Sequence, residues 1–416
     1  MKKLILCTAI FLIASFAFCM SVTRVEEIND YDSEPMLDNF YGTGAGRPLS
    51  YYDNVKVSLV TISKDDPVYA WFGHAGIVVE EPGREAVMYD WGRFTFGPEF
   101  YVNFLKGNLM YNCGRFYAAN EMENAIDSNR TIRKMELNLT SEQKKDIINF
   151  VNVNSSDSYN TYRYEMFKDN CATRIRDIIN ASVNGRLESW AKSQPGYTYR
   201  EQISKVLCVN IPLNWTLDFL LGPEVDAKAT LWDEMFLPAN LAEAVSDFEG
   251  IVKEDSYVYD GRSTDTRKQD ATVPQSYVQL VAIAGVALAL ITAFFYAVLP
   301  KFYKIEMFIV NFVFGMLGLI LLYLMTYTNH AFAYFNENIL FINPLLLFCA
   351  FWSLKTPKHK HALKSVYSIL STLVVILIVC KVGMRSIFCQ DNYGQIVMVL
   401  PYYLTNILLL NKNSEN

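Results

Sequence analysis

Short runs of apolar and polar residues alternate through residues 50–250, a length that suits one domain with its own core. Apolar and polar positions alternate over residues 55–59, as in a half-buried strand. Residues 74–79 and 86–94 form two further apolar runs, and Gly83 marks a turn between them. We therefore expect a small antiparallel sheet.

Two helices follow these strands. Residues 141–152 have an acidic start and an apolar face, which is typical of a capped amphipathic helix. A second helix begins at Cys171 and carries an apolar stripe of Ile175, Ile178 and Ile179. Strands followed by helices predict an α+β domain, with the sheet packed against the helices.

The pattern changes near residue 277, where long apolar stretches begin. Residues 251–276 are polar and charged, so we interpret them as a linker between the domain and a transmembrane region, residues 277–416. This region predicts a bundle of about five helical spans. Their expected limits are Val278–Leu299, Met307–Tyr327, Ile339–Leu354, Val366–Val382 and Ile396–Leu410.

Charge and the N-terminus indicate how the chain is oriented. Residues 1–20 combine a lysine pair with a short apolar run, which is typical of a signal peptide, and residues 21–49 form an irregular lead-in. Most lysines of the second half lie in residues 300–306 and 355–364 and in the C-terminal tail, as expected for cytoplasmic segments. We expect a multi-pass protein of the cytoplasmic (inner) membrane with its N-terminal domain in the periplasm.

Composition excludes several classes of function. The formal net charge of −6 and the lack of a basic patch with interleaved aromatics argue against nucleic-acid binding. No ligand spacing for a metal and no phosphate-binding loop is found, so we expect neither a metal nor a cofactor. The exported region has Cys113, Cys171 and Cys208. A Cys113–Cys208 disulfide would leave Cys171 free, and two buried unpaired thiols are the alternative.

Cys171 is the candidate nucleophile, and His74 is the only histidine before the spans. At a helix start, Asp169 or Asn170 can cap the free N–H groups, and the helix dipole favours a thiolate. Arg174, one turn on, would strengthen this effect if it folds back. The alternative is structural: Cys171 as a small buried apolar residue and His74 as a core imidazole.

A third group should orient the imidazole of His74. Tyr89 and Asp90 lie on the adjacent predicted strand, and alternation lets only one of them face the site. We favour Asp90, although it could instead be a turn residue before Gly92.

Polar residues also follow the second predicted span. His330, Asn336 and Asn338 lie beside hydrocarbon, where such groups usually face a bundle interior or a site. An ordinary interfacial loop is the alternative.

These motifs together resemble the Bacteroidetes lipoprotein N-acyltransferase family called Lnb, over nearly all of the chain after residue 50. The resemblance rests on motifs in a shared order, which are Phe72-Gly73-His74-Ala75, Tyr89-Asp90-Trp91-Gly92, Tyr162-Arg163-Tyr164, the segment Phe167 to Asp177, Thr198-Tyr199-Arg200, Leu221 to Asp226, Glu234 to Pro238, and His330, Asn336, Asn338 and Asn343-Pro344.

The resemblance implies a circularly permuted papain-like domain, similar to lecithin:retinol acyltransferase, in which histidine precedes cysteine. It implies acyl transfer through a Cys171 thioester to the α-amino group of a diacylglyceryl-cysteine lipoprotein, with His74 as the base. The partners would be diacylated lipoproteins and membrane phospholipid. Asn170 joins the catalytic residues, and the expected substrate-binding residues are Arg174, His330, Asn336 and Asn338.

Two other functions remain open. The same pair of residues could serve a membrane-anchored hydrolase, such as a phospholipase, amidase or peptidase, with water as the acceptor. A non-catalytic membrane scaffold with a structural Cys171 is the other.

Overall fold

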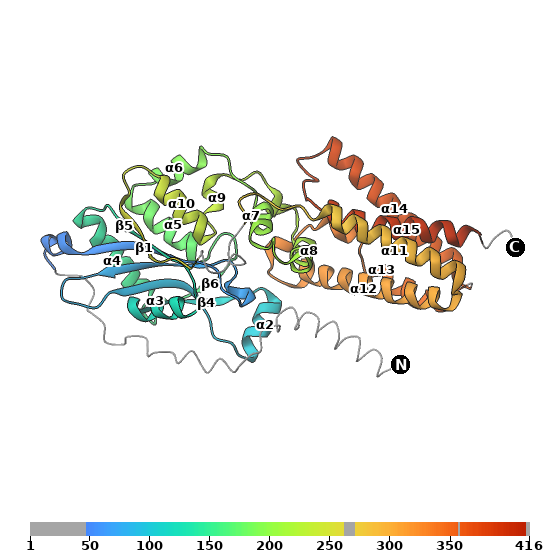
Figure 1. Ribbon diagram of the computed structural model, residues 1–416, viewed down its shortest axis with the longest axis horizontal. Coiled ribbons are helices and arrows are strands. Elements are labelled where there is room, and N and C mark those ends of the chain that lie inside the picture. The colour runs from blue at the N-terminus through green and yellow to red at the C-terminus, as the bar shows by residue number, and fades with distance from the viewer. Residues whose placement is uncertain (1–46, 262–270, 357, 413–416) are drawn as a thin grey trace. The chain divides into compact units, whose positions relative to one another are not determined.

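The computed structural model describes residues 47–261, 271–356 and 358–412. The predicted signal peptide and most of the predicted lead-in lie outside this part. The chain forms two compact units (Figure 1). The first takes its described residues from Met1–Phe104, Asn108–Tyr197 and Ala229–Ala271. The second takes them from Leu105–Gly107, Thr198–Lys228 and Thr272–Asn416.

The first unit is built on a seven-stranded antiparallel sheet in the order β6-β4-β3-β2-β1-β5-β7. This confirms the expected α+β class, and the first three predicted strands are its β1, β2 and β3. The strands are β1 (Lys56–Ile62), β2 (His74–Glu80), β3 (Val87–Arg93), β4 (Met110–Tyr117), β5 (Ile132–Leu137), β6 (Thr161–Arg163) and β7 (Val252–Tyr259).

Helices cover both faces of this sheet. The larger core lies on one face and includes apolar side chains of α4, α5 and α10, while α3 closes a smaller core on the other (Figure 1). Both helices expected from the pattern are present, as α4 and α5. The helices of this unit are η1 (Leu49–Asn54), η2 (Val68–Ala70), α2 (Pro98–Lys106), α3 (Ala118–Asp127), α4 (Ser141–Asn154), α5 (Cys171–Ser182), α6 (Arg186–Lys192), α9 (Leu231–Glu234) and α10 (Pro238–Asp247).

Strand β7 corrects the predicted linker. Residues 251–276 were expected to connect two domains, but Val252–Tyr259 pairs with β5 as an edge strand of the sheet. Most of its side chains are exposed, including Lys253, Glu254 and Asp255. An edge strand with charged residues shows no buried alternation, so its sequence looks like a solvated connection.

The second unit contains four helices that are long and apolar enough to cross a membrane, among the residues that the structure describes. They are α11 (Val278–Val298), α12 (Pro300–Tyr327), α14 (Lys360–Gly383) and α15 (Tyr393–Lys412). Shorter elements accompany them, which are α7 (Tyr199–Val206), α8 (Ile211–Leu220), η3 (Pro223–Asp226), η5 (Ala331–Ala333), η6 (Glu337–Leu340) and α13 (Leu345–Ser353).

The third predicted span, Ile339–Leu354, is not one continuous helix. Its helical part, α13, is about 14 Å long at 1.5 Å per residue, about half of the ~30 Å hydrocarbon core. The first part is the short turn η6 and an irregular stretch to Pro344, whose ring disfavours helix at Asn343. The backbone at Asn343 packs directly against Gly318 of α12. Only glycine leaves room for this approach, because a Cβ at position 318 would lie 2.4 Å from the Asn343 Cα. Hydropathy alone cannot detect this break.

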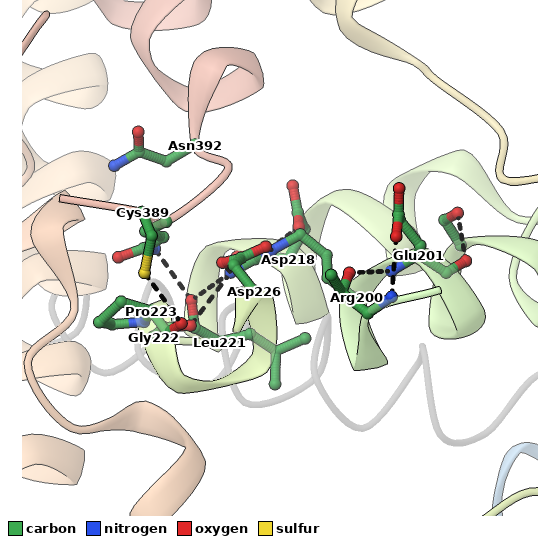
Figure 2. Close-up of polar contacts among 12 residues, drawn as sticks. Arg200, Glu201, Asp218, Leu221, Gly222, Pro223, Asp226, Cys389 and Asn392 are labelled. Atoms are coloured by element: carbon green, nitrogen blue, oxygen red, sulfur yellow. Dashed lines mark hydrogen bonds and ion pairs between the residues drawn. The ribbon is translucent and has the colours of Figure 1, made fainter. Parts of the chain in front are cut away.

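Residues 198–228 belong to the second unit, and buried ion pairs connect them to one another and to the rest of that unit. Arg200 donates from Nε to Asp226 Oδ1 at 2.7 Å and from Nη2 to Asp226 Oδ2 at 2.9 Å, and its Nη1 pairs with Asp218 (Figure 2). Tyr277 Oη also donates to Asp218, and Gln395 Nε2 does so at 3.2 Å. These contacts tie α7 and α8 to the starts of α11 and α15.

Candidate active site

The structure places Cys171 as the first residue of α5, with Asn170 as the N-cap. Asn170 Oδ1 accepts from the N–H groups of Ala172 and Thr173, both at 2.9 Å. Its Nδ2 donates to the carbonyls of Met166 and Phe236, at 2.7 and 2.9 Å. Because all of these partners are fixed protein groups, Asn170 holds the start of the helix rigidly in place.

The N–H groups of this first turn are almost all used. Asn170 N–H donates to Thr173 Oγ1 at 2.8 Å, and Arg174 N–H donates to the Asn170 carbonyl at 3.1 Å. Among the described residues, the Cys171 N–H is the one backbone donor of this turn that has no protein acceptor. A developing oxyanion beside the Cys171 sulfur would find this donor free.

His74 and Asp90 lie side by side, as the sequence predicts. Asp90 of β3 accepts from His74 Nε2 through Oδ2 at 2.8 Å. With Asp90 ionised, Nε2 carries the proton and Nδ1 is the ring nitrogen available to the thiol. Cys171 also acts on the His74 ring, and its interaction raises the pKa of the imidazole. A Cys–His–Asp chain of contacts therefore joins β2, β3 and the start of α5.

Electrostatics favours a charged imidazole here. Burial alone would lower the pKa of His74, but the hydrogen bond and charge of Asp90, together with Cys171, raise that pKa to about 9. Burial would raise the pKa of Asp90, but the charge of Arg93 and the contact with His74 lower it to about 2. The carboxylate thus stays ionised and keeps a positive charge on His74 through the neutral range.

Arg93 forms an ion pair with Asp90 and also contacts Glu121. The sequence pattern did not identify either residue as part of the site. Arg93 Nε donates to Asp90 Oδ1 at 2.8 Å, and its Nη2 donates to Glu121 Oε2 at 2.6 Å. Arg93 lies three residues after Asp90 on a strand that bulges between Trp91 and Arg93. No spacing rule marks such a pair before the bulge is known.

The other predicted residues of the first unit lie elsewhere. Tyr89 points away from His74 and donates to Asn152 Oδ1 of α4 at 2.8 Å. Arg174 folds back onto Asp169, with Nη2 donating to Oδ2 at 2.7 Å, and stacks 4.5 Å from the centre of the Tyr162 ring. Arg174 is thus already paired with a carboxylate, and its substrate-binding role stays a prediction.

His330, Asn336 and Asn338 are buried in the second unit. Asn336 and Asn338 both donate through Nδ2 to the Phe219 carbonyl at 3.0 Å, which holds the end of α8. The His330 ring lies against the Phe332 ring, 5.1 Å between centroids. These contacts give the residues a part in the fold, and their predicted role toward substrate stays a prediction.

The three cysteines of the predicted exported region are all free thiols. The proposed Cys113–Cys208 disulfide is therefore not formed, and Cys113 is buried in β4, where burial raises the pKa of its thiol. Among the described residues, no group of three or more His, Cys, Asp or Glu side chains could hold a metal ion.

Two family models match the chain in the places where these features lie. The Lnb N-terminal periplasmic domain matches residues 49–205, which include His74, Asp90 and Cys171. The Lnb transmembrane domain matches residues 268–408. The chain belongs to the Lnb family. It is a multi-pass inner-membrane protein with a periplasmic N-terminal domain, and membership of the Lnb family indicates a role in lipoprotein processing at the membrane. No curated protein and no solved structure matches the chain.

Asp90→Asn is expected to lower the pKa of His74, because burial remains while the neighbouring negative charge is removed. We expect slower alkylation of Cys171 by iodoacetamide at pH 6–7 and a rate profile displaced to higher pH. In the parent, protonation of His74 stabilises the folded state, because folding raises the pKa of this residue from 6.5 to about 9. This contribution to stability is complete below pH 6.5 and is lost as the pH rises through about 9. The measurement is mass spectrometry of the Cys171 peptide over a pH series.

Asp177→Asn is the matched control, because Asp177 is an exposed carboxylate of α5 that pairs with Arg176. Its alkylation profile should match that of the parent. An unchanged profile in Asp90→Asn would show that Asp90 does not set the charge of His74.

Proposed function

We propose that this chain moves a fatty acyl chain from a glyceryl ester of a membrane lipid, through Cys171, to the α-amino group of a diacylglyceryl-cysteine lipoprotein. The observation that carries the proposal is the Cys171 thiol at the start of α5, next to a His74 ring that Asp90 orients through a hydrogen bond of 2.8 Å and whose pKa Cys171 raises. Membership of the Lnb family supports a lipoprotein as the acceptor. The membrane-spanning helices support lipid-anchored substrates.

In the first step, the Cys171 sulfur attacks the ester carbonyl carbon. The carbon–sulfur bond forms, and the bond from the carbonyl carbon to the glyceryl oxygen breaks. His74 holds the thiol proton as imidazolium and delivers it to the departing glyceryl oxygen. The Cys171 N–H is the candidate donor to the oxyanion of this step, since capping by Asn170 leaves it free.

In the second step, the α-amino group of the lipoprotein attacks the thioester. The carbon–nitrogen bond forms, the carbon–sulfur bond breaks, and the amine proton passes through His74 while the thiolate is restored. Asp90 stays ionised throughout, because its pKa of about 2 lies far below the working pH. Its role is to orient the ring and to stabilise its positive charge.

The test is mass spectrometry of the N-terminal lipopeptide of a reporter lipoprotein, in cells that lack their own N-acylating enzyme. Cells expressing the parent chain should yield a third, amide-linked acyl chain, and cells expressing Cys171→Ser should not. Cys113→Ser, a change at another buried free thiol of the same domain, is the matched control and should behave as the parent.

Two outcomes would overturn the proposal. Free fatty acid or peptide without any N-acylated lipopeptide would indicate a hydrolase. Full N-acylation by a well-expressed Cys171→Ser chain would assign the cysteine a structural role.

A further inference from the structure

Aromatic side chains gather around α2 in the periplasmic domain, beside the strands that carry the site. Phe94 lies at their centre, with its ring 5.0 Å from both Phe96 and Phe100 and 4.8 Å from Tyr111. Tyr69 packs on Phe94 and Phe96, at 6.0 and 5.9 Å. We call these five residues the aromatic cluster.

The outer side of this cluster is open to its surroundings. Helix α2 buries none of its residues, and Phe96, Tyr101 and Leu105 are 47%, 54% and 55% exposed. The helix carries only Glu99 and Lys106 as charged residues, one near each end. Large exposed apolar surfaces of this kind mark interaction sites, and an apolar helix face with aromatic residues suits a membrane interface.

The inner side of the cluster leads to the nucleophile. The Tyr111 ring lies 4.6 Å from the ring of Tyr164. The Tyr164 ring lies beside Gly92 of β3, two residues after Asp90, because a Cβ at Gly92 would be 3.7 Å from it. Burial first and then the charge of a Cys171 thiolate raise the pKa of Tyr164. A continuous row of rings thus runs from exposed Phe96 through Phe94, Tyr111 and Tyr164 toward Cys171.

The end of α2 indicates what covers the open side. Its last residues, Leu105 and Lys106, belong to the second unit. The Lys106 carbonyl accepts from the Asn329 N–H at 2.8 Å, and Gly107, with φ of +72°, lies so close that a Cβ would meet Asn329 at 2.7 Å. Asn329 comes two residues after Tyr327, the last residue of α12. The last residues of α2 are therefore held by the segment that follows a candidate membrane span.

We propose that α2 lies in the periplasmic leaflet of the inner membrane, and that the aromatic cluster binds the acyl chain of a phospholipid on its way to Cys171. The first half of this inference concerns membrane contact alone. The second half rests on the proposed function. Aromatic rings suit both tasks, because they are favoured at the boundary of headgroups and acyl chains and offer apolar contact to a chain.

The test of membrane contact uses photocrosslinking of the full chain in phospholipid nanodiscs. Benzoylphenylalanine replaces Tyr101 in one variant and Tyr257 in another. Tyr257 is the matched control, since it is also a tyrosine, 45% exposed, and lies on β7 at the opposite edge of the sheet from β6. We expect phospholipid adducts at position 101 and few at position 257.

Equal lipid labelling at both positions would overturn the inference. So would crosslinks from position 101 to this chain itself or to a second copy, because a protein segment would then cover α2. The readout needs no acyl transfer and can be repeated in a Cys171→Ser background. A failure of the proposed function therefore leaves this test valid.

Phe94→Ser tests the acyl route. We expect acylation of Cys171 from bilayer phospholipid to slow by about tenfold, the effect of one or two lost methylene contacts. Alkylation of Cys171 by iodoacetamide, which needs no acyl site, should be unchanged. Parallel losses in both rates would indicate a damaged fold, and an unchanged acylation rate would remove the cluster from the acyl route.

Discussion

His74→Ala is expected to slow acylation of Cys171 by about 10²- to 10⁴-fold, the usual contribution of a positioned acid–base group. In the proposed mechanism, the variant loses the group that accepts the thiol proton and returns it to the leaving glyceryl oxygen. It also leaves Asp90 with Arg93 as its charged partner, so the carboxylate stays paired and the fold should survive. The measurement is the initial rate of label transfer from a labelled phospholipid to the Cys171 peptide.

Free imidazole should restore part of the lost rate, because the space left by His74 lies between Asp90 and the thiol. His361→Ala is the control, since His361 is exposed in α14 and lies far along the chain from the site. A His74→Ala chain that keeps the parental rate would exclude His74 as the base and would favour a structural role for this residue.

Arg200→Met is expected to have the largest effect on stability. The substitution keeps an apolar stem but leaves the carboxylates of Asp218 and Asp226 without their cation, and both are nearly buried. Removing one partner of a buried ion pair costs about 3–5 kcal/mol. We expect a clear fall in the apparent Tm of the full chain in detergent.

The loss should grow with pH. Burial already raises the pKa of Asp218 and of Asp226 in spite of Arg200, and removal of Arg200 raises both further. Carboxyl groups whose pKa is raised by folding favour the fold when protonated, and that stability is lost as the pH rises. The Tm deficit of Arg200→Met should therefore be larger at pH 8 than at pH 5.

Two variants make this result specific. Lys192→Met removes the cation of an exposed pair with Glu188 and should change the Tm little. Adding Asp218→Asn and Asp226→Asn to Arg200→Met should recover part of the loss. A parental Tm in Arg200→Met would show that the two carboxyl groups do not need this cation.

The local pattern of the sequence was sufficient to predict several of the strands and helices that form the larger core of the periplasmic domain. Helices α4 and α5 each bury an apolar side, and strands β2 and β3 are apolar runs that are buried on both faces, so helical spacing and apolar runs reveal them. The expected half-burial of β1 is wrong, because all of its residues except Lys56 are buried. Strand β7 was not predicted as a strand, because most of its side chains are exposed to solvent and show no apolar alternation. The break in the third predicted span was not foreseen, because η6 and α13 share one apolar stretch in spite of different backbone conformations.

Local sequence rules also account for part of the candidate site. Asp90 lies across from Gly76 on the strand beside His74, and Cys171 follows a capping asparagine, so local rules placed each residue at the end or on the face where it lies. The packing of α5 against β2 then brings the thiol to the imidazole. Arg93 and Glu121 could not be found in this way. They meet through a bulge in β3 and the packing of α3 on the sheet, which depend on contacts distant in the sequence.

The most direct test of acyl transfer through Cys171 is to follow one acyl chain through the purified protein. The full chain in nanodiscs is given phospholipid with a labelled acyl chain, and label on the Cys171 peptide that hydroxylamine releases marks the thioester. A diacylated lipopeptide with a free N-terminal amine is then added. We expect that label leaves Cys171 and appears as an amide on the lipopeptide, while an N-acetylated lipopeptide receives none. Label that never reaches Cys171, or that passes to water as free fatty acid while the lipopeptide is present, would contradict this mechanism.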